Sequence, residues 1–320
     1  MGGPSGHARK LSGPLSPTAL RRFVPTSAGL AALLLWMVGC VGGPAGDRFV
    51  QDDAGRKVTL SGTPEQVLTL APNVTELVAE AAGVGRLAGA SVADDFPPGV
   101  TSLPRFQGFP LDREAVVALQ PGLVLGSTDV NTSDDADALA ALGLPTYLFR
   151  FRSVADVPRA MRTLDTLLAT SGGARAAEAF EARVRAVETA VAGFAPLRVL
   201  LLVGDETLYT FGRDSYASEM VRLAGGLNVT DGYDGAAAQP SDEAVLEMAP
   251  EVIVVLAGAD YDPADLLTKH PAFLNLPAVQ NRRVYGLNPD LVSRPGPRIA
   301  DGLERLARLL HPEAFAAGAA

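Results

Sequence analysis

A chain of 320 residues, 48% of them apolar, is long enough to form two α/β domains with a substantial core. Its net charge of −9 argues against nucleic acid as a partner, because binding to phosphate backbones needs a basic surface. The acidic balance is compatible with docking onto a basic protein surface, and it is also typical of a soluble acidic protein without such a partner.

The chain begins with the features of a secretion signal. All 36 acidic residues follow position 39, whereas Arg9, Lys10, Arg21 and Arg22 precede it. Behind these basic residues lies an apolar run over residues 28–38, which is too short for a transmembrane helix, since that needs about 20 residues. A basic segment followed by a short apolar core is typical of a signal peptide. We therefore expect residues 1–39 to be a signal and the rest to work outside the cytoplasm.

The signal ends at Gly39 and Cys40, the chain's single cysteine, which excludes a disulfide framework. A small residue before a lone cysteine resembles the signal of bacterial lipoproteins, in which the cysteine receives a lipid and becomes the first residue. Met37 departs from the leucine that is usual three positions before it. The alternative is an ordinary secretory signal with an incidental free cysteine. The glycine-rich residues 40–48 predict a flexible tether, so a lipid on Cys40 would anchor the domain at a membrane.

Residues 49–152 predict an N-terminal α/β lobe. Residues 49–60 read as a β-hairpin, and strands are expected over residues 66–70, 86–91 and 145–149. After the first of these strands, Asn73 is expected to cap a helix, with Glu76 at the spacing of a capping box.

The loop over residues 103–110 is a candidate ligand site, because α/β proteins bind ligands in loops at one edge of the sheet. Arg105, Phe106 and Phe109 offer it a charge and two flat apolar faces. For each aromatic ring the alternative is packing in the core.

One motif occurs twice. Residues 111–126, LDREAVVALQPGLVLG, return in degraded form as residues 241–256, SDEAVLEMAPEVIVVL. In both copies an acid opens a short amphipathic helix, a proline stops it, and an apolar run predicts a buried strand. Helix–proline–strand joints are common in α/β proteins, but a repeated one indicates two similar lobes.

The segment over residues 153–172 is the predicted connecting helix. Its apolar residues recur at helical spacing, Ser153 and Asp156 are expected to cap it, and Gly172 and Gly173 to end it. Residues 173–320 then predict a C-terminal α/β lobe with a second amphipathic helix, a buried strand over residues 197–203 and a C-terminal helix after Pro297.

The order of these segments resembles a known family. VLTLAPNVTE at residues 67–76, SVADDFPP at 91–98, LPRFQGF at 103–109 and EAVVALQPGLVLG at 114–126 look, in that order, like the periplasmic binding proteins for cobalamin, ferric siderophores and haem. These are the substrate-delivery subunits of ABC importers. The resemblance covers about residues 49–312.

This resemblance implies an α/β fold with two Rossmann-like lobes joined by a single long α-helix and a ligand cleft between the lobes. Because a helix resists bending, it also implies a small closure on the ligand. The expected function is capture of a metal chelate outside the cytoplasm and its delivery to the permease. An α/β enzyme and a structural surface lipoprotein are the alternatives, and the sequence lacks a nucleophile elbow, a phosphate loop and a full dinucleotide fingerprint.

Glu114 and Glu243 match the two glutamates, one on each lobe, with which this family docks onto arginines of the permease. The alternative is that each carboxylate only stabilises the start of its helix through the helix dipole. The resemblance implies a monomer that works with a permease dimer and its cytoplasmic ATPase.

For the ligand, Asp290 and Arg294 match residues that reach cobalamin in its binding protein, and Phe106 and Tyr209 fall at its aromatic walls. The alternative for Asp290 and Arg294 is that they pair with each other or cap the last helix. Ala93, Ser127 and about Ala237 replace bulky aromatic walls of that binder, so a ferric siderophore fits as well. Its negative charge could meet three arginines, Arg105, Arg213 and Arg294.

Haem is a further alternative. Haem binders of this family usually offer a tyrosine or histidine, where this chain has Gln107 and Gly108. No cofactor and no directly bound metal ion are expected, because metal sites need several convergent ligands and the chain has three histidines, one of them in the signal.

Overall fold

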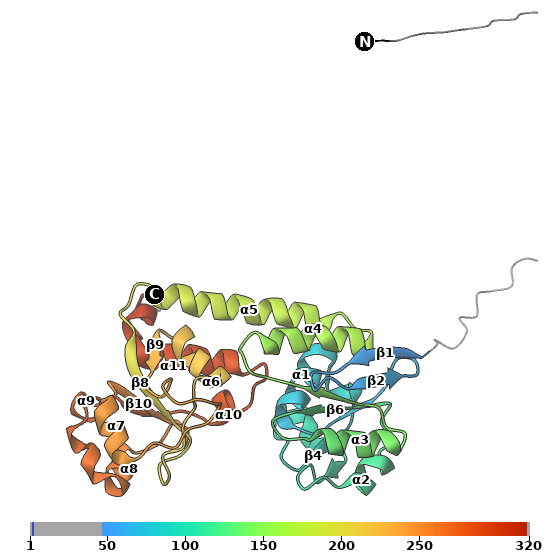
Figure 1. Cartoon of the computed structure of the whole chain (residues 1–320), viewed down its shortest axis with the longest axis horizontal. Coiled ribbons are helices and arrows are strands. Elements are labelled where there is room, and N and C mark those ends of the chain that lie inside the picture. The colour runs from blue at the N-terminus through green and yellow to red at the C-terminus, as the bar shows by residue number, and fades with distance from the viewer. Residues whose placement is uncertain (1, 3–46, 319–320) are drawn as a thin grey trace, which may run out of the picture. The chain divides into compact units, whose positions relative to one another are not determined.

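The computed structural model describes Gly2 and residues 47–318 (Figure 1). The predicted signal over residues 1–39, the predicted lipidation site Cys40 and most of the tether predicted over residues 40–48 lie outside the described residues. Among the described residues, no helix has both the length and the apolar character needed to cross a membrane.

The N-terminal lobe is built on a five-stranded parallel sheet with the strand order β5-β4-β3-β6-β7. The predicted hairpin precedes it as the antiparallel pair β1 and β2. The strands are β1 (Arg48–Gln51), β2 (Lys57–Leu60), β3 (Val67–Thr69), β4 (Leu87–Ser91), β5 (Arg105–Phe106), β6 (Leu123–Ser127) and β7 (Thr146–Phe149). The helices are α1 (Pro72–Ala82), α2 (Arg113–Ala118) and α3 (Ser133–Ala141), with 3-10 turns at Val84–Arg86 and Pro98–Ser102.

The C-terminal lobe is built on a four-stranded parallel sheet with the order β11-β10-β8-β9. Its strands are β8 (Leu197–Leu202), β9 (Gly226–Asn228), β10 (Val252–Val255) and β11 (Val284–Gly286). Its helices are α6 (Tyr216–Leu223), α7 (Asp242–Met248), α8 (Pro263–Lys269), α9 (Pro277–Gln280), α10 (Asp290–Ser293) and α11 (Ile299–Leu310), with 3-10 turns at Pro271–Asn275 and Pro312–Gly318.

Two helices, not one, separate the strands of the first sheet from those of the second along the chain. The segment predicted as the connector forms α4 (Asp156–Leu168), which ends at Ala169 in a left-handed conformation with φ of 51°. The longer helix is α5 (Gly172–Val191), with 20 residues (Figure 1). It begins against α1 and ends beside Gly225 of the C-terminal lobe. The connecting helix predicted over residues 153–172 is therefore wrong in position, since α5 is the helix that reaches both lobes.

Gly172 and Gly173 begin α5 and do not end α4, contrary to the prediction. A Cβ atom on Gly172 would collide with the carbonyl group of Ala81 in α1, and one on Gly173 with the carbonyl group of Met161 in α4. Glycine is needed here because the backbones of α1, α4 and α5 approach closely.

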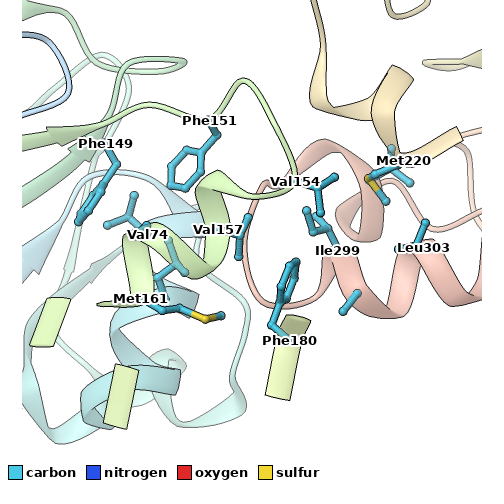
Figure 2. Close-up of a cluster of buried hydrophobic side chains, with 14 of the residues drawn as sticks. Val74, Phe149, Phe151, Val154, Val157, Met161, Phe180, Met220, Ile299 and Leu303 are labelled. Carbon is cyan, nitrogen blue, oxygen red and sulfur yellow. The ribbon is translucent and has the colours of Figure 1, made fainter. Parts of the chain in front are cut away.

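A single hydrophobic core, here called the shared core, extends through both lobes. It contains Val67, Leu123 and Leu125 from the first sheet together with Val199 and Leu201 from the second. Figure 2 shows side chains of α1, α4, α5, α6 and α11 meeting there, among them Val74, Val157, Met161, Phe180, Met220 and Ile299.

The opposite face of each sheet has its own apolar cluster, because successive strand residues point to opposite faces. In the N-terminal lobe, Leu68 and Val124 pack with Val116 of α2 and form the N-terminal outer cluster. In the C-terminal lobe, Leu200 and Leu202 pack with Val245 of α7 and form the C-terminal outer cluster. Hence α2 and α7 occupy equivalent faces of the two sheets.

Candidate functional site

A cavity of about 510 Å³ is lined by residues of both lobes. On the N-terminal side the lining residues follow the carboxyl ends of β6 and β7, and on the C-terminal side they lie at the start of α6 and in the loop after β9. They are Thr128, Asp129, Arg150, Phe151, Arg152, Asp214, Ser215, Tyr216, Gly235 and Ala236. Carboxyl ends of parallel strands are the usual ligand edge of an α/β sheet, so this cavity is the candidate binding cleft.

The cavity mixes positive, negative and neutral polar groups. Asp129 accepts a hydrogen bond from Ser127 Oγ at 3.2 Å. Burial raises the pKa of Asp129, an effect that this hydrogen bond and the charges of Arg152 and Arg150 oppose. The Tyr216 hydroxyl donates to the Val292 carbonyl at 2.7 Å, and burial raises the pKa of this phenol, which keeps it neutral. A ligand here would meet both donors and acceptors.

Exposed apolar side chains follow the carboxyl ends of strands in both sheets. Half of the large apolar side chains that the described chain leaves exposed follow carboxyl ends of strands, namely Val92, Phe96, Phe109, Val130, Val203 and Tyr209. Phe109 is 74% exposed and Tyr209 is 50% exposed. A charged cavity and exposed aromatic rings at the carboxyl ends of strands suit a ligand that has a broad apolar face and polar arms.

The predicted ligand residues fall into several groups, and none of them lines the cavity. Phe109 and Tyr209 are exposed at the strand ends, as a ligand contact requires. Arg105, the first residue of β5, donates to the Asp94 carbonyl after β4 at 2.8 Å. Arg213 pairs with Asp234 at 3.2 Å, directly before the lining residues of α6.

Phe106 does not form the predicted aromatic wall. It is 3% exposed and packs in the N-terminal outer cluster with Leu70 and Val116. As the last residue of β5 it pairs with Ser91 of β4, and its ring turns towards α2. The alternative prediction of core packing holds for this residue.

Asp290 and Arg294 pair with each other, as the alternative prediction had it, with 3.1 Å between Oδ1 and Nε. Arg294 also contacts Asp95 of the N-terminal lobe at 2.6 Å. Next to them Arg298 binds Glu76 of α1 in a bidentate pair at 2.9 and 2.6 Å. We call this set, with Asn73 donating to the Pro295 carbonyl, the interlobe seam.

The start of α1 differs from the predicted one. The helix begins at Pro72 with Ala71 as its N-cap, so neither Asn73 nor Glu76 forms a capping box. Both side chains reach the C-terminal lobe instead. Glu76 is 3% exposed, and a buried carboxylate needs a charged or hydrogen-bonding partner, which Arg298 supplies.

The repeated motif has the same local structure in both lobes. The amide of Ala115 donates to Asp112 Oδ1 at the start of α2, and that of Ala244 donates to Ser241 Oγ at the start of α7. After the helices, Gln120 and Ala249 both adopt left-handed conformations, with φ of 47° and 40°. The inferred internal repeat is thus present in three dimensions.

Glu114 and Glu243 are exposed at the second position of these helices. A hydrogen bond from its own amide and one from the Ser241 hydroxyl lower the pKa of Glu243, so this carboxylate is charged at neutral pH. The two glutamates therefore present one carboxylate from each lobe, on the faces that carry the outer clusters.

Sequence reasoning missed the residues that line the cavity, above all Asp129, Arg150, Arg152 and Asp214. A signal for three of them was available, because Asp129 lies shortly after the apolar run that ends the first copy of the repeat, and Arg150 and Arg152 follow the strand predicted over residues 145–149. Within residues 47–318, no three His, Cys, Asp or Glu side chains gather in a way that could hold a metal ion.

The family model described as periplasmic binding protein matches residues 67–291. The chain therefore belongs to the periplasmic binding protein family. It is a substrate-binding protein of the ABC importer type, which works outside the cytoplasm with a permease and an ATPase, and its relatives are transport proteins and not enzymes. The predicted family and the two-lobed α/β class are confirmed.

Three similar proteins show the range of this class. A substrate-binding lipoprotein of an ABC transporter in Bacillus subtilis is 26% identical over 280 residues, 83% of this chain and 86% of that protein. The periplasmic vitamin B12 binding protein of Vibrio cholerae is 26% identical, with a TM-score of 0.67, and covers 79% of this chain and 98% of that one. A periplasmic haem-binding protein in complex with two haems is 25% identical, with a TM-score of 0.69. The match covers 80% of this chain and 100% of that one.

Proposed function

We propose that this chain is a lipid-anchored binding protein that captures a cobalt or iron chelate, a cobalamin-like corrinoid or a ferric siderophore, and delivers it to its permease. The observation that carries the proposal is the charged cavity lined by both lobes, together with the exposed rings of Phe109 after β5 and Tyr209 after β8. Corrinoids and siderophore chelates have broad apolar faces and polar or charged arms, which this surface complements.

Two small residues favour a bulky ligand. Ala93 and Ala237 are exposed at positions where the resemblance to the cobalamin binder implies aromatic walls. Ser127, the third such position, is fully buried and takes no part in a wall. Small side chains leave room that a chelate larger or more polar than cobalamin could fill. The similarity to a vitamin B12 binding protein supports a corrinoid.

Haem is the second candidate, and Tyr209 is the residue that favours it. Its phenol is half exposed and could ligate iron, and a haem-binding protein is among the similar structures. The loop at Gln107 and Gly108 offers no such ligand. Gly108 packs closely, since a Cβ atom there would approach Ser91 Oγ to 2.9 Å.

The anchor and the docking sites belong to the same proposal. A lipid on Cys40 would hold the domain at the membrane, and the Bacillus subtilis relative is a lipoprotein. Glu114 and Glu243 would then pair with cations of the permease, one for each lobe. Exposed ion pairs contribute little affinity each, so their role is to orient the two proteins and to speed their encounter.

Titration of the mature domain with cyanocobalamin, a ferric hydroxamate, a ferric catecholate and haemin tests the ligand. Tyrosine fluorescence reports binding, because Trp36 belongs to the predicted signal. We expect saturable binding of a corrinoid or a ferric siderophore, weakened about tenfold by Tyr209→Ala, which corresponds to about 1.4 kcal/mol. The distant Phe49→Ala variant should bind as the wild type does.

The Tyr209→Phe variant separates the two candidates. It keeps the apolar ring and removes the phenol oxygen, so corrinoid or siderophore binding should be nearly unchanged. If haem were the ligand, the same variant would shift the haem absorption bands and weaken binding. Saturable binding of none of the four compounds would refute the proposal.

A further inference from the structure

Each helix of the repeat carries an exposed apolar side chain one turn after its glutamate. Val117 follows Glu114 in α2, Leu246 follows Glu243 in α7, and both apolar side chains are 37% exposed. Residues three apart on a helix are neighbours, with about 5–6 Å between their Cβ atoms. Each lobe thus presents a carboxylate and an apolar group side by side.

The orientation of these pairs is fixed by packing. Val116 and Val245 are fully buried in the outer clusters, so the helices cannot rotate without exposing them. The matching caps and the matching left-handed residues at Gln120 and Ala249 fix the two ends. The pairs Glu114–Val117 and Glu243–Leu246 therefore take equivalent positions on the two lobes.

A single exposed apolar residue needs no explanation, since it is common on protein surfaces. Here, however, the exposed position recurs at the same place in both copies, although the residues differ. The second copy keeps a large apolar side chain at a site where solubility alone would favour a polar one. A shared binding role accounts for both positions.

We propose that Val117 and Leu246 are the apolar centres of two equivalent contact patches that bind the permease of the importer. The inference rests on the proposed docking function and adds to it that affinity comes from these side chains, while the glutamates orient. Interfaces generally place apolar groups at the centre and charges at the rim. Two equivalent patches suit a partner built from two equivalent halves.

Charge complementarity selects this occupant over a second copy of the chain. A self-association through these patches would bring Glu114 or Glu243 of one copy against a glutamate of the other, and like charges in contact oppose binding. A cationic permease surface with an apolar area beside each cation meets both groups of each pair.

The test compares two double variants of the full-length lipoprotein bound to its permease and ATPase in nanodiscs. The permease is identified as the membrane protein that cross-links to the wild-type chain and co-purifies with an ABC ATPase. In Val117→Ser/Leu246→Ser we expect dissociation to be at least about tenfold faster, with an unchanged salt dependence of the association rate. In Glu114→Gln/Glu243→Gln we expect slower association and a weaker salt dependence.

The matched control is Phe49→Ser, which also replaces an exposed apolar side chain by serine but lies outside the two patches. Phe49 is 58% exposed on the β1–β2 hairpin, which packs on the shared core and not on an outer cluster. The Phe49→Ser variant should dissociate from the permease at the wild-type rate. Thermal unfolding of every variant checks that the fold is intact.

The outcomes are distinct. If E114R/E243R keeps the cross-link and normal uptake, the docking function itself fails. If E114R/E243R abolishes docking while Val117→Ser/Leu246→Ser dissociates at the wild-type rate, the apolar patches are refuted and the docking glutamates stand.

Discussion

Glu76 is a buried carboxylate whose main partner, Arg298, lies 222 residues away in the other lobe. The side chain of Glu76 is 2% exposed and that of Arg298 is 14% exposed. Arg298 also lies over the Phe96 ring, at 4.4 Å from its centroid. Removing one partner of such a pair leaves a charge with poor solvation, which costs far more than the intact pair contributes.

We expect Glu76→Ala to lower the free energy of unfolding by about 3 kcal/mol, as is usual when one member of a buried pair is removed. The double variant Glu76→Leu/Arg298→Met should recover most of this loss, since it removes both charges. Urea unfolding measures the effect, and Glu80→Gln, an exposed position on the same helix, is the control. A loss below about 0.5 kcal/mol for Glu76→Ala, the usual range of surface changes, would contradict the assignment.

At this scale the sequence led to wrong or ambiguous predictions wherever a side chain has a partner far away along the chain. Asn73 and Glu76 have the spacing of a capping box, and a local pattern contains no information about a partner 222 residues later. For Asp290 and Arg294 the sequence allowed either ligand binding or mutual pairing. Only the three-dimensional positions of the two side chains show that they pair. Phe106 was ambiguous for the same reason, because the face of a two-residue strand cannot be read from its own sequence.

At the scale of elements, Asp165 holds the turn between α4 and α5. Its carboxylate accepts hydrogen bonds from the amides of Gly173 and Ala174 at 2.8 and 2.7 Å and from the Thr170 hydroxyl at 2.7 Å. Burial works to raise the pKa of Asp165, but these three hydrogen bonds outweigh it and lower the pKa below its ordinary value.

A lowered pKa in the folded state means that Asp165 stabilises the fold above its ordinary pKa, and that this contribution is lost as the pH falls through the folded value. We expect Asp165→Asn to be less stable than the wild type by about 1 kcal/mol at pH 7, from weakened hydrogen bonds to a charged acceptor. The difference should shrink below about pH 4. Denaturant unfolding at several pH values measures it, with the exposed Asp260→Asn as control. A difference independent of pH would contradict this role.

The sequence predicted most elements correctly, and the repeat led to the two equivalent helices α2 and α7. It misplaced the connecting helix because Gly172 and Gly173 are ordinary stop signals. Their actual role, a close approach of α5 to α1 and α4, depends on packing between distant segments. The cavity was missed for a related reason, since its two sides come from segments of different lobes that are far apart in the sequence.

At the scale of the whole molecule, two features oppose hinge bending. The 20-residue helix α5 contacts both lobes, and the interlobe seam ties α1 to the segment before α11. We expect ligand binding to leave the radius of gyration nearly unchanged, because the interface backbone of pre-organised complexes moves by about 1 Å or less on binding. Small-angle X-ray scattering with and without ligand measures this.

Weakening the seam provides the comparison. In Glu76→Ala/Arg298→Ala the ligand should produce a larger change than in the wild type, because the bidentate pair is lost and only the weaker seam contacts of Arg294 and Asn73 remain beside α5 and the shared core. A large change in the wild type, similar to that of this variant, would show that the seam opens freely.

The placement of α2 and α7 on the outer clusters separates them from the core that joins the lobes. Alternate strand residues assign the shared core to one face of each sheet and the outer clusters to the other, so the helices that carry Glu114 and Glu243 do not contribute to the core that unites the lobes. If these glutamates dock onto the permease as we propose, exchanging two short segments between relatives would redirect a binding protein to another importer while its cargo specificity stays the same. On this proposal, evolution is equally free to change the importer and the cargo separately.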